Sequence, residues 1–379
     1  MGVPRTKQER FHFLDGLRGI ASLMIVVHHS FTSAIVKLFA YIKIPVLGFY
    51  FSYFTQSGVE LFFVLSGIVL LRPYLRKERP FKTGQYFIRR IKRIYPPYLV
   101  ALLFAASVCW YIHAYPTWYT AKVFHIYFQW DELLKEAAII NFDGGYYNLA
   151  WWSLGIEILF YILVPVCIFI FPSREKINNR RMIIMILITM AISVCLQLWL
   201  TEYYPAVYSY KRLVPTTFQA ICYPVCFLMG MLLAAKDFNV RQAYAFIAAG
   251  SLLIIASIVY LPIVNPGYGL AYAGIIILSF NLQSFRTFLS KPIMIWIGER
   301  SYSLFLTHFS VFYLLDNVTA HFLADRNAYY AIITRGIGIP LAIFAAMLLF
   351  HFVERKQAHG LVTGNIFWPW QVKKLQIPN

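Results

Sequence analysis

The sequence predicts an all-α protein, a polytopic membrane bundle of about ten transmembrane helices. Two observations support this fold class. Hydrophobic residues make up 60% of the 379 residues and charged residues only 13%, which is too little charge for the surface of a soluble protein of this length. The apolar residues also gather into runs of about 20, the length that an α-helix needs to cross the hydrocarbon core of a bilayer.

Ten such runs follow one another, each bounded by charged or turn-forming residues. The eighth run is the shortest, and the segment NPGYG (265–269) leaves little room for a loop before it. We expect residues 1–379 to form a single integral membrane domain without an appended soluble domain, because only 25 residues follow Glu354. The expected spans are residues 16–36, 50–71, 95–114, 148–171, 182–200, 214–235, 243–262, 268–283, 293–315 and 329–353.

The placement of Lys and Arg predicts the orientation. If the N-terminus is inside, the inner segments hold 24 of the 34 Lys and Arg, which is the bias that cytoplasmic loops show. We therefore expect both termini in the cytoplasm and the Tyr- and Trp-rich segment 115–147 outside, at the membrane interface. The net charge of +18 then reflects these loops, and no nucleic-acid partner is expected because no nucleic-acid-binding motif is present.

The first run carries polar residues that hydrocarbon excludes unless they face a protein interior or a watery cavity. Arg18 and His29 are 11 residues apart, so they share one helical face about 16 Å apart along the axis. Asp15 precedes Arg18 by three residues and can pair with it, whereas His28 points about 100° away. A lone histidine usually hydrogen-bonds a neighbouring helix, but a stripe that is polar at both ends favours a functional face.

Three further spans bring deep polar residues. The segment SGVELFFVLSG (57–67) contains Glu60, and WWSLGIEILFY (151–161) contains Ser153 and Glu157 one helical turn apart. The segment GERSYSLFLTH (298–308) contains Tyr302 and His308. Taken singly, each is equally well explained by a structural hydrogen bond between helices. Four spans that each contribute such a group predict one shared cavity.

A basic cluster, FIRRIKRIYPPY (87–98), precedes the third span. Arg89, Arg90 and Arg93 are expected on one side of a helix that enters the membrane. Positive cytoplasmic loops would explain the charge, but not three arginines around one face. The arginine fork grips phosphate oxygens in pairs. The cluster therefore predicts a phosphate site at the cytoplasmic mouth of the bundle.

Several catalytic classes lack their motifs. The chain has no G-x-S-x-G, no G-x-x-x-x-G-K-[ST] and no H-E-x-x-H pattern, so serine hydrolases, P-loop ATPases and zinc proteases have no support. Cys222 and Cys226 have no histidines nearby in the sequence that could complete a zinc site. No metal is expected.

Taken together, FLDGLRGIASLMIVVHHS, SGVELFFVLSG, RRIKRIYPPY, WWSLGIEILFY and GERSYSLFLTH resemble the acyltransferase-3 family of integral membrane acyltransferases. The match covers nearly the whole chain in the same order and ends with FVERK (352–356). This resemblance implies a bundle of about ten helices in a bacterial inner membrane. It also implies transfer of acyl groups from cytoplasmic acyl-CoA to extracytoplasmic glycans.

The resemblance also implies roles for particular residues. His29 corresponds to the deep first-helix histidine of the family, because the D-G-L-R spacing selects it over its neighbour. Arg18 corresponds to the first-helix arginine, Arg90 and Arg93 to the R-x-x-R pair, and Glu157 to the acid of W-S-L-x-x-E. One departure is the glutamate in SGVE, where the family often has aspartate.

These residues suggest a mechanism. Arg18, Arg90 and Arg93 would hold acyl-CoA, by family analogy acetyl-CoA, and its thioester would lie near His29. The His29 imidazole would take the proton of an incoming hydroxyl as general base. Glu157 or Glu60 would hold the ring. An acyl-enzyme intermediate is an open alternative.

Two other function classes stay open on the sequence. A transporter of a small anionic or acylated solute would also line a path with polar residues, although we find no inverted repeat of the kind that transporters often show. A sensor or scaffold would leave the arginine cluster without a purpose. The acceptor is open among lipopolysaccharide, capsule, exopolysaccharide, peptidoglycan and small molecules.

Overall fold

The structure, a computed structural model, describes residues 11–78, 80–118, 128–138, 146–203, 223–257, 263–323 and 332–355. Within these ranges all regular elements are helical and none is a strand, which confirms the all-α prediction. The elements that matter most for the site are α1 (His12–Tyr41), α2 (Pro45–Gln56), α3 (Gly58–Leu75), α4 (Thr83–Ala114), α6 (Trp130–Ala137), α7 (Trp152–Ile170), α15 (Pro292–Glu299), α16 (Ser301–Phe322) and α18 (Gly338–Leu349). Further helices are α8 (Asn179–Tyr203), α11 (Pro224–Ala235), α12 (Val240–Ala256), α13 (Val264–Asn281), α14 (Gln283–Leu289) and the π-helical turns η4 (Ile332–Ile337) and η5 (Phe350–Glu354).

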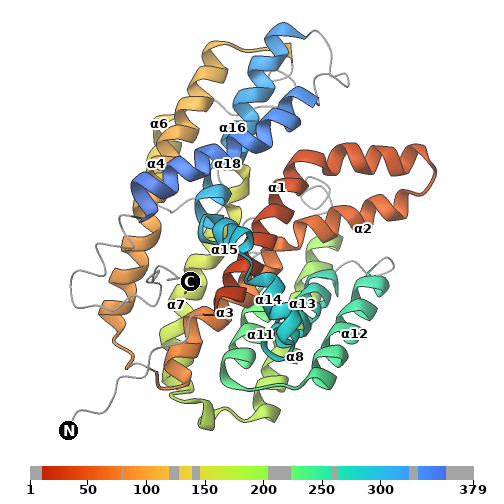
Figure 1. Cartoon of the computed structure of the whole chain (residues 1–379), viewed down its shortest axis with the longest axis vertical. Helices are drawn as coiled ribbons and strands as arrows, with labels where there is room; N and C mark the ends of the chain where they lie inside the picture. The colour runs from red at the N-terminus through yellow and green to blue at the C-terminus, as the bar shows by residue number, and fades with distance from the viewer. Residues whose placement is uncertain are drawn as a thin grey trace, which may run out of the picture.

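Helix α1 occupies the middle of the bundle. Figure 1 shows α4, α16 and α18 on one side of it and α3, α11, α12 and α13 on the other. At its far end the chain turns back through Lys43, whose φ of 61° lies in the left-handed region, so that α1 and α2 lie side by side (Figure 1). Residues from both halves of the chain can therefore meet around α1.

Glycines allow the backbones to approach closely where α1 meets α15. A Cβ atom on Gly298 would lie 1.9 Å from the carbonyl oxygen of Asp15, far inside van der Waals contact. The same holds between α3 and α11, where a Cβ on Gly67 would lie 2.3 Å from the carbonyl oxygen of Phe227. Small residues at such crossings are typical of helices packed in membranes.

The main apolar core lies between α1, α3, α7, α11 and α13. The rings of Phe160 and Phe227 stack within it with their centroids 4.5 Å apart. Phe63 packs edge-on against Phe160 at 5.0 Å. This core fixes the face of α3 and α7 that is turned toward α1.

The described residues do not confirm the expected count of ten membrane spans. Four helical segments, residues 45–75, 83–114, 149–170 and 333–354, are long and apolar enough to cross a membrane, and the number rises to six if each of two bent pairs forms one span. Helices α11 and α12 are apolar but shorter, and α16 carries polar residues such as Asp316 and Asn317. The count of ten is therefore not confirmed, although each expected run coincides at least in part with a helix. Parts of the sixth, seventh and tenth runs, and residues 119–127 and 139–145 of segment 115–147, lie outside the described residues.

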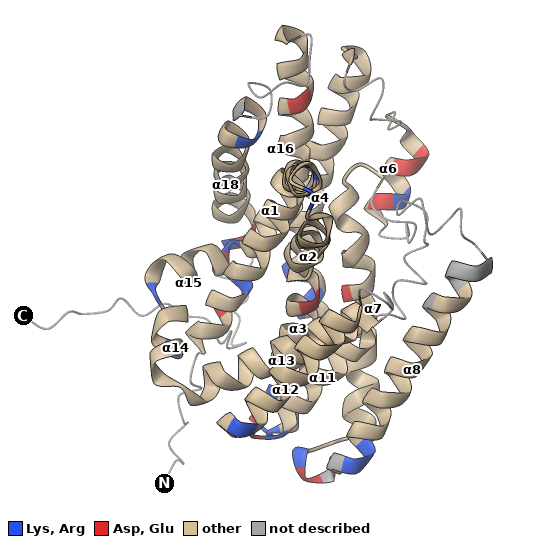
Figure 2. Ribbon diagram, turned by 90° about the vertical axis from the view of Figure 1, so that its right-hand side faces the viewer, with Lys and Arg blue, Asp and Glu red and all other residues tan. Residues whose placement is uncertain are grey.

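Three loops that the sequence assigns to the inner side meet at one end of the bundle. Arg76 bonds Asp237 at 2.6 Å, Lys77 bonds Glu175 at 3.4 Å, and Arg174 lies 3.7 Å from Asp237. The hydrogen bond from Arg76 holds the pKa of Asp237 below its usual value. Figure 2 shows charged residues gathered at this end, below α8, α11 and α12.

Candidate active site

A cavity lies between α1, α3, α4, α7 and α16. Its polar lining brings together residues that are far apart in the sequence: Arg18, Ser66, Arg90, Arg93, Ser153, Glu157, Tyr161, Ser301 and Tyr302. Six of the residues expected at the site are among these nine. Apolar side chains of α1, α3, α4 and α16 form the rest of the wall.

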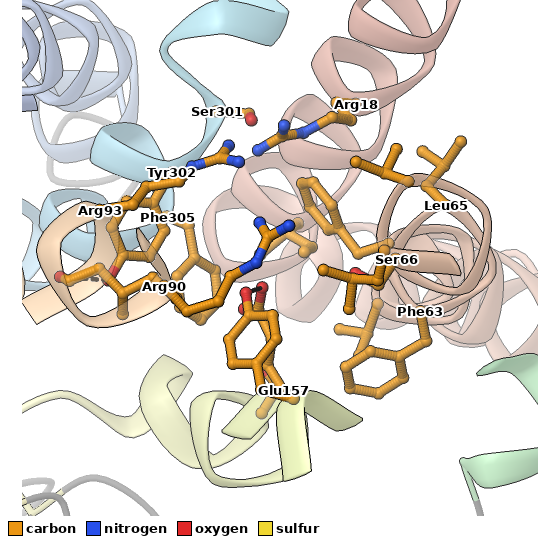
Figure 3. A pocket seen from close by; sticks show the side chains of 18 residues that line it. Arg18, Phe63, Leu65, Ser66, Arg90, Arg93, Glu157, Ser301, Tyr302 and Phe305 are labelled. Atoms are coloured by element: carbon orange, nitrogen blue, oxygen red, sulfur yellow. Dashed lines mark hydrogen bonds between the residues drawn. The ribbon is translucent and has the colours of Figure 1, made fainter. Parts of the chain in front are cut away.

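The three arginines turn their guanidinium groups toward the same space (Figure 3). Arg18 comes from α1 and the other two from the first half of α4. The Nε atom of Arg90 is buried and has no hydrogen-bond partner among the described residues. Its guanidinium carbon lies 5.4 Å from the ring centroid of Tyr86 and 5.7 Å from that of Tyr161. The stacked rings orient this cation, but one buried donor is left to be satisfied.

Arg89 does not belong to this group. It donates a 3.3 Å hydrogen bond to the hydroxyl of Tyr74 and does not line the cavity. The sequence placed it on the same face as Arg90 and Arg93, and that part of the interpretation is wrong. Arg89 and Arg90 are consecutive and so lie about 100° apart around the helix axis, which is enough to turn one toward α3 and the other into the cavity.

One acidic side chain lies among the cavity-lining residues. Glu157 accepts a hydrogen bond from the hydroxyl of Tyr161, one helical turn further along α7. Figure 3 shows Glu157 close to Arg90, and the ring of Tyr161 lies 5.7 Å from the guanidinium carbon of Arg90. The charge of Glu157 also acts on Arg18. The structure therefore places Glu157 with the arginines.

A second acid, Glu354 in η5, stands behind the cavity. It is buried, accepts a 2.6 Å hydrogen bond from the Ser303 hydroxyl, and interacts electrostatically with Arg18 and Arg93. Glu354 is not among the site residues expected from the sequence. Glu354 stands in FVERK, directly before Arg355 and Lys356, where a span ordinarily ends in charged residues. The one signal in the sequence was that Glu354 is a lone acid at the end of a long apolar run.

Tyr302 lines the cavity but its hydroxyl is occupied. It donates a 3.0 Å hydrogen bond to the backbone carbonyl oxygen of Ile94, next to Arg93. Tyr302 thus ties α16 to the stretch of α4 that carries the arginines.

His29 is not among the cavity-lining residues. Its ring packs with those of Phe309, His28 and His308, at centroid distances of 4.6, 5.1 and 5.4 Å. The Nδ1 atom of His28 lies 3.1 Å from the hydroxyl of Thr55. The structure brings His29 together with His308, which the sequence had selected separately.

Along α1 and α16, apolar residues lie between the arginine cavity and the histidines. Ile25 and Phe305 line the cavity, and they precede His29 and Phe309 by four residues. One helical turn, about 6 Å along the axis, therefore separates the apolar end of the cavity from the histidines. The shared face predicted for Arg18 and His29 runs past these apolar residues.

The remaining candidates lie apart from the cavity lining. Asp15 is buried where α1 meets α15, and its charge acts on Arg18. Glu60 is buried on α3, and its charge acts on Tyr268, Tyr272 and Cys226. Neither Glu60 nor Glu157 is brought beside His29. The titratable residues that act on the His29 ring within the described ranges are His28 and His308. The described residues also contain no group of three or more His, Cys, Asp or Glu arranged to hold a metal ion.

Comparison of the sequence with known proteins identifies relatives of this chain. The chain is 25% identical over 383 aligned positions to a Staphylococcus aureus (strain COL) protein named "Putative O-acetyltransferase", covering 92% of this chain and 58% of the relative. It is 24% identical over 323 positions to the acyltransferase MdmB of Streptomyces mycarofaciens, covering 80% of this chain and 79% of that protein. A third relative, Protein 2 in the picA locus of Rhizobium radiobacter, is 35% identical over 119 positions, which cover 30% of this chain and 55% of that protein.

The chain thus spans somewhat more than half of the length of the S. aureus relative. No solved structure matches it. The sequence model of the acyltransferase-3 family, described as an acyltransferase domain, matches residues 11–352. Because that match covers nearly the whole chain, the protein belongs to the acyltransferase-3 family.

Proposed function

We propose that the protein is a multi-pass O-acyltransferase of a bacterial inner membrane. It moves an acyl group, acetyl in the simplest case, from cytoplasmic acyl-CoA to a hydroxyl of a cell-surface or exported glycan. Family membership supports acyl transfer, and the name of the S. aureus relative supports an oxygen as the acceptor atom. The choice of acyl-CoA as donor rests on the cavity.

The observation that carries this proposal is the convergence of Arg18, Arg90 and Arg93 in one cavity. Coenzyme A brings several phosphate charges, and arginine binds phosphate oxygens through paired, charge-assisted hydrogen bonds. A bound phosphate would also supply the hydrogen-bond acceptor that the buried Nε atom of Arg90 lacks among the described residues. Acyl-CoA therefore fits the charge and the donor groups of this cavity.

Glu157 and Glu354 provide the counter-charge. Together with the three arginines they leave the site with a net positive charge, which favours an anionic ligand and limits the repulsion between the arginines. We assign Glu157 to this task, because it lies with the arginines and accepts its hydrogen bond from Tyr161. Its role is to hold the donor site in shape.

The apolar end of the cavity gives the pantetheine arm a direction. If the CoA phosphates bind the arginines, the pantetheine arm extends past Ile25 and Phe305. It then points toward His29, which lies one helical turn beyond Ile25. Displacement of these two side chains would bring the thioester to the imidazole. His29 then serves as general base.

The reaction is balanced in protons and electrons. The neutral His29 imidazole takes the proton from the acceptor hydroxyl, and the hydroxyl oxygen forms a bond to the thioester carbon. The carbon–sulfur bond then breaks and the CoA thiolate leaves with the electron pair. The His29 imidazolium returns the proton to the sulfur and the base is regenerated.

A binding measurement tests the donor site. Isothermal titration of CoA into the purified protein in nanodiscs should show binding, and Arg90→Ala should weaken it by roughly 10–100-fold, since hydrogen bonds to charged groups contribute about 1.5–3 kcal/mol. Arg89→Ala is the matched control, because the neighbouring Arg89 bonds Tyr74 outside the cavity, and its affinity should be unchanged. Equal CoA affinity in both variants would remove the donor site and leave transport of another anion as the better reading.

A further inference from the structure

A second imidazole, that of His308, lies beside the His29 ring. The two rings come from α1 and α16, lie 5.4 Å apart between centroids and are tilted by 31°. Val26, three residues before His29 on α1, packs in one apolar cluster with Leu304 and Val311, which flank His308 on α16. The two helices thus hold the imidazoles against one another.

Hydrogen bonding fixes the tautomer of His308. Its Nδ1 atom lies 2.9 Å from the backbone carbonyl oxygen of Leu304. A carbonyl oxygen can only accept, so Nδ1 carries the hydrogen. In the neutral ring, Nε2 then has a lone pair and can accept a hydrogen bond.

That acceptor is left without a partner. His308 is fully buried, and its Nε2 atom has no hydrogen-bond partner within the described part of the chain. A buried polar atom of this kind costs free energy until a donor reaches it. The ring of His29, 5.4 Å away between centroids, carries an N–H group that can serve as this donor.

The spacing suits a bond between His29 and His308. An N–H···N bond of about 2.9 Å between two imidazole rings separates their centroids by roughly 5 Å. The observed 5.4 Å is close to that separation. No carboxylate is among the titratable residues that act on His29 in the described ranges, although a carboxylate usually orients a catalytic imidazole.

We propose that His308 is a positioning residue: its Nε2 atom accepts the ring N–H of His29 and so leaves the other nitrogen of His29 bare, facing the substrates. This inference rests on the proposed function, in which His29 is the general base. When His29 takes the proton of the acceptor hydroxyl, the neutral His308 ring stabilises the imidazolium through the same bond. A neutral partner does this without a fixed buried charge, which hydrocarbon disfavours.

The first test reads the tautomer and needs no activity. In protein labelled with ¹⁵N-histidine, the resonances of His29 are identified by their loss in His29→Asn. The wild type should show His29 in a single tautomer, with one protonated and one bare ring nitrogen. His308→Leu should show averaged shifts, and His308→Gln, whose side-chain carbonyl can accept the same N–H, should restore the single tautomer. His28→Gln is the matched control, at a similar ring distance from His29, and should leave the tautomer unchanged.

The second test reads the rate of transfer of labelled acetyl from acetyl-CoA to the glycan fraction of envelope membranes. His308→Leu should lower kcat by about 10–100-fold, the range seen when a group that orients a functional imidazole is removed, with the KM for acetyl-CoA unchanged. His308→Gln should recover most of that loss. An unchanged His29 tautomer in His308→Leu, or a Gln variant that behaves as the Leu variant does, overturns the pairing. Absence of transfer by the wild type would count against the proposed function alone, since the tautomer measurement still decides the pairing.

Discussion

The Ser303 hydroxyl donates a 2.6 Å hydrogen bond to the Glu354 carboxylate. Both side chains are buried, and the bond joins α16 to the helical turn that ends the tenth expected span. The same carboxylate interacts with Arg18 and Arg93. A single contact between residues that are 51 positions apart thus holds a counter-charge behind the arginine cavity.

We expect Glu354→Gln to destabilise the protein. The amide can still accept from Ser303, but the negative charge that interacts with Arg18 and Arg93 is lost, so the buried arginines lose part of their compensation. Thermal unfolding in detergent should show a clear drop in melting temperature. Glu299→Gln is the control, because Glu299 lies 3.9 Å from Arg300 with both side chains partly exposed, and such pairs contribute little. Equal melting temperatures for the two variants would contradict this account of Glu354.

Part of this site could be predicted from the sequence. Helical spacing selected Arg18, Arg90, Arg93, Ser153 and Glu157, and all of them line one cavity. The reason is physical: charged and hydroxyl groups inside long apolar runs have few places to go except a shared interior. The single acid of the fourth span and the arginines before the third were informative for that reason.

The rest depended on contacts between helices, which spacing along one helix does not contain. The stripe from Arg18 to His29 is interrupted by Ile25 and by Phe305 from another helix, so the cavity ends before the histidine. Glu60 is turned toward α13 and Glu354 toward α16, and nothing in either local sequence specifies that neighbour. The span count stays unconfirmed for a related reason, since a helix such as α16 carries polar residues that only its packing partners explain.

We expect lysine to replace arginine only in part at the donor site. Arg90→Lys and Arg93→Lys keep the charge but lose the planar fork, so CoA affinity should fall between those of the wild type and the alanine variants. Titration calorimetry on correctly inserted protein measures this. A purely topological role of the arginines in setting orientation makes the opposite forecast, in which lysine restores everything and alanine disturbs insertion rather than affinity.

The orientation can be tested by labelling. We predict that a cysteine placed at Thr120 reacts with an impermeant thiol reagent in intact cells, and that one placed at Lys77 does not. Thr120 lies outside the described residues, whereas Lys77 is exposed in the loop that meets Glu175. Labelling of the unsubstituted chain, which has five cysteines, gives the background. Reaction at Lys77 but not at Thr120 would reverse the orientation and with it the side from which the donor enters.

The most direct measurement compares acetyl transfer by His29→Ala and His28→Ala. The central claim is that an arginine cavity holds acyl-CoA while His29, one turn beyond it, removes the proton of the acceptor. His29→Ala should therefore lose transfer of labelled acetyl to the glycan fraction by roughly 10²–10⁴-fold, the usual effect of removing a general base, while CoA binding by calorimetry stays intact. His28→Ala should keep most of its activity. Full transfer by His29→Ala, or loss confined to His28→Ala, would contradict the account.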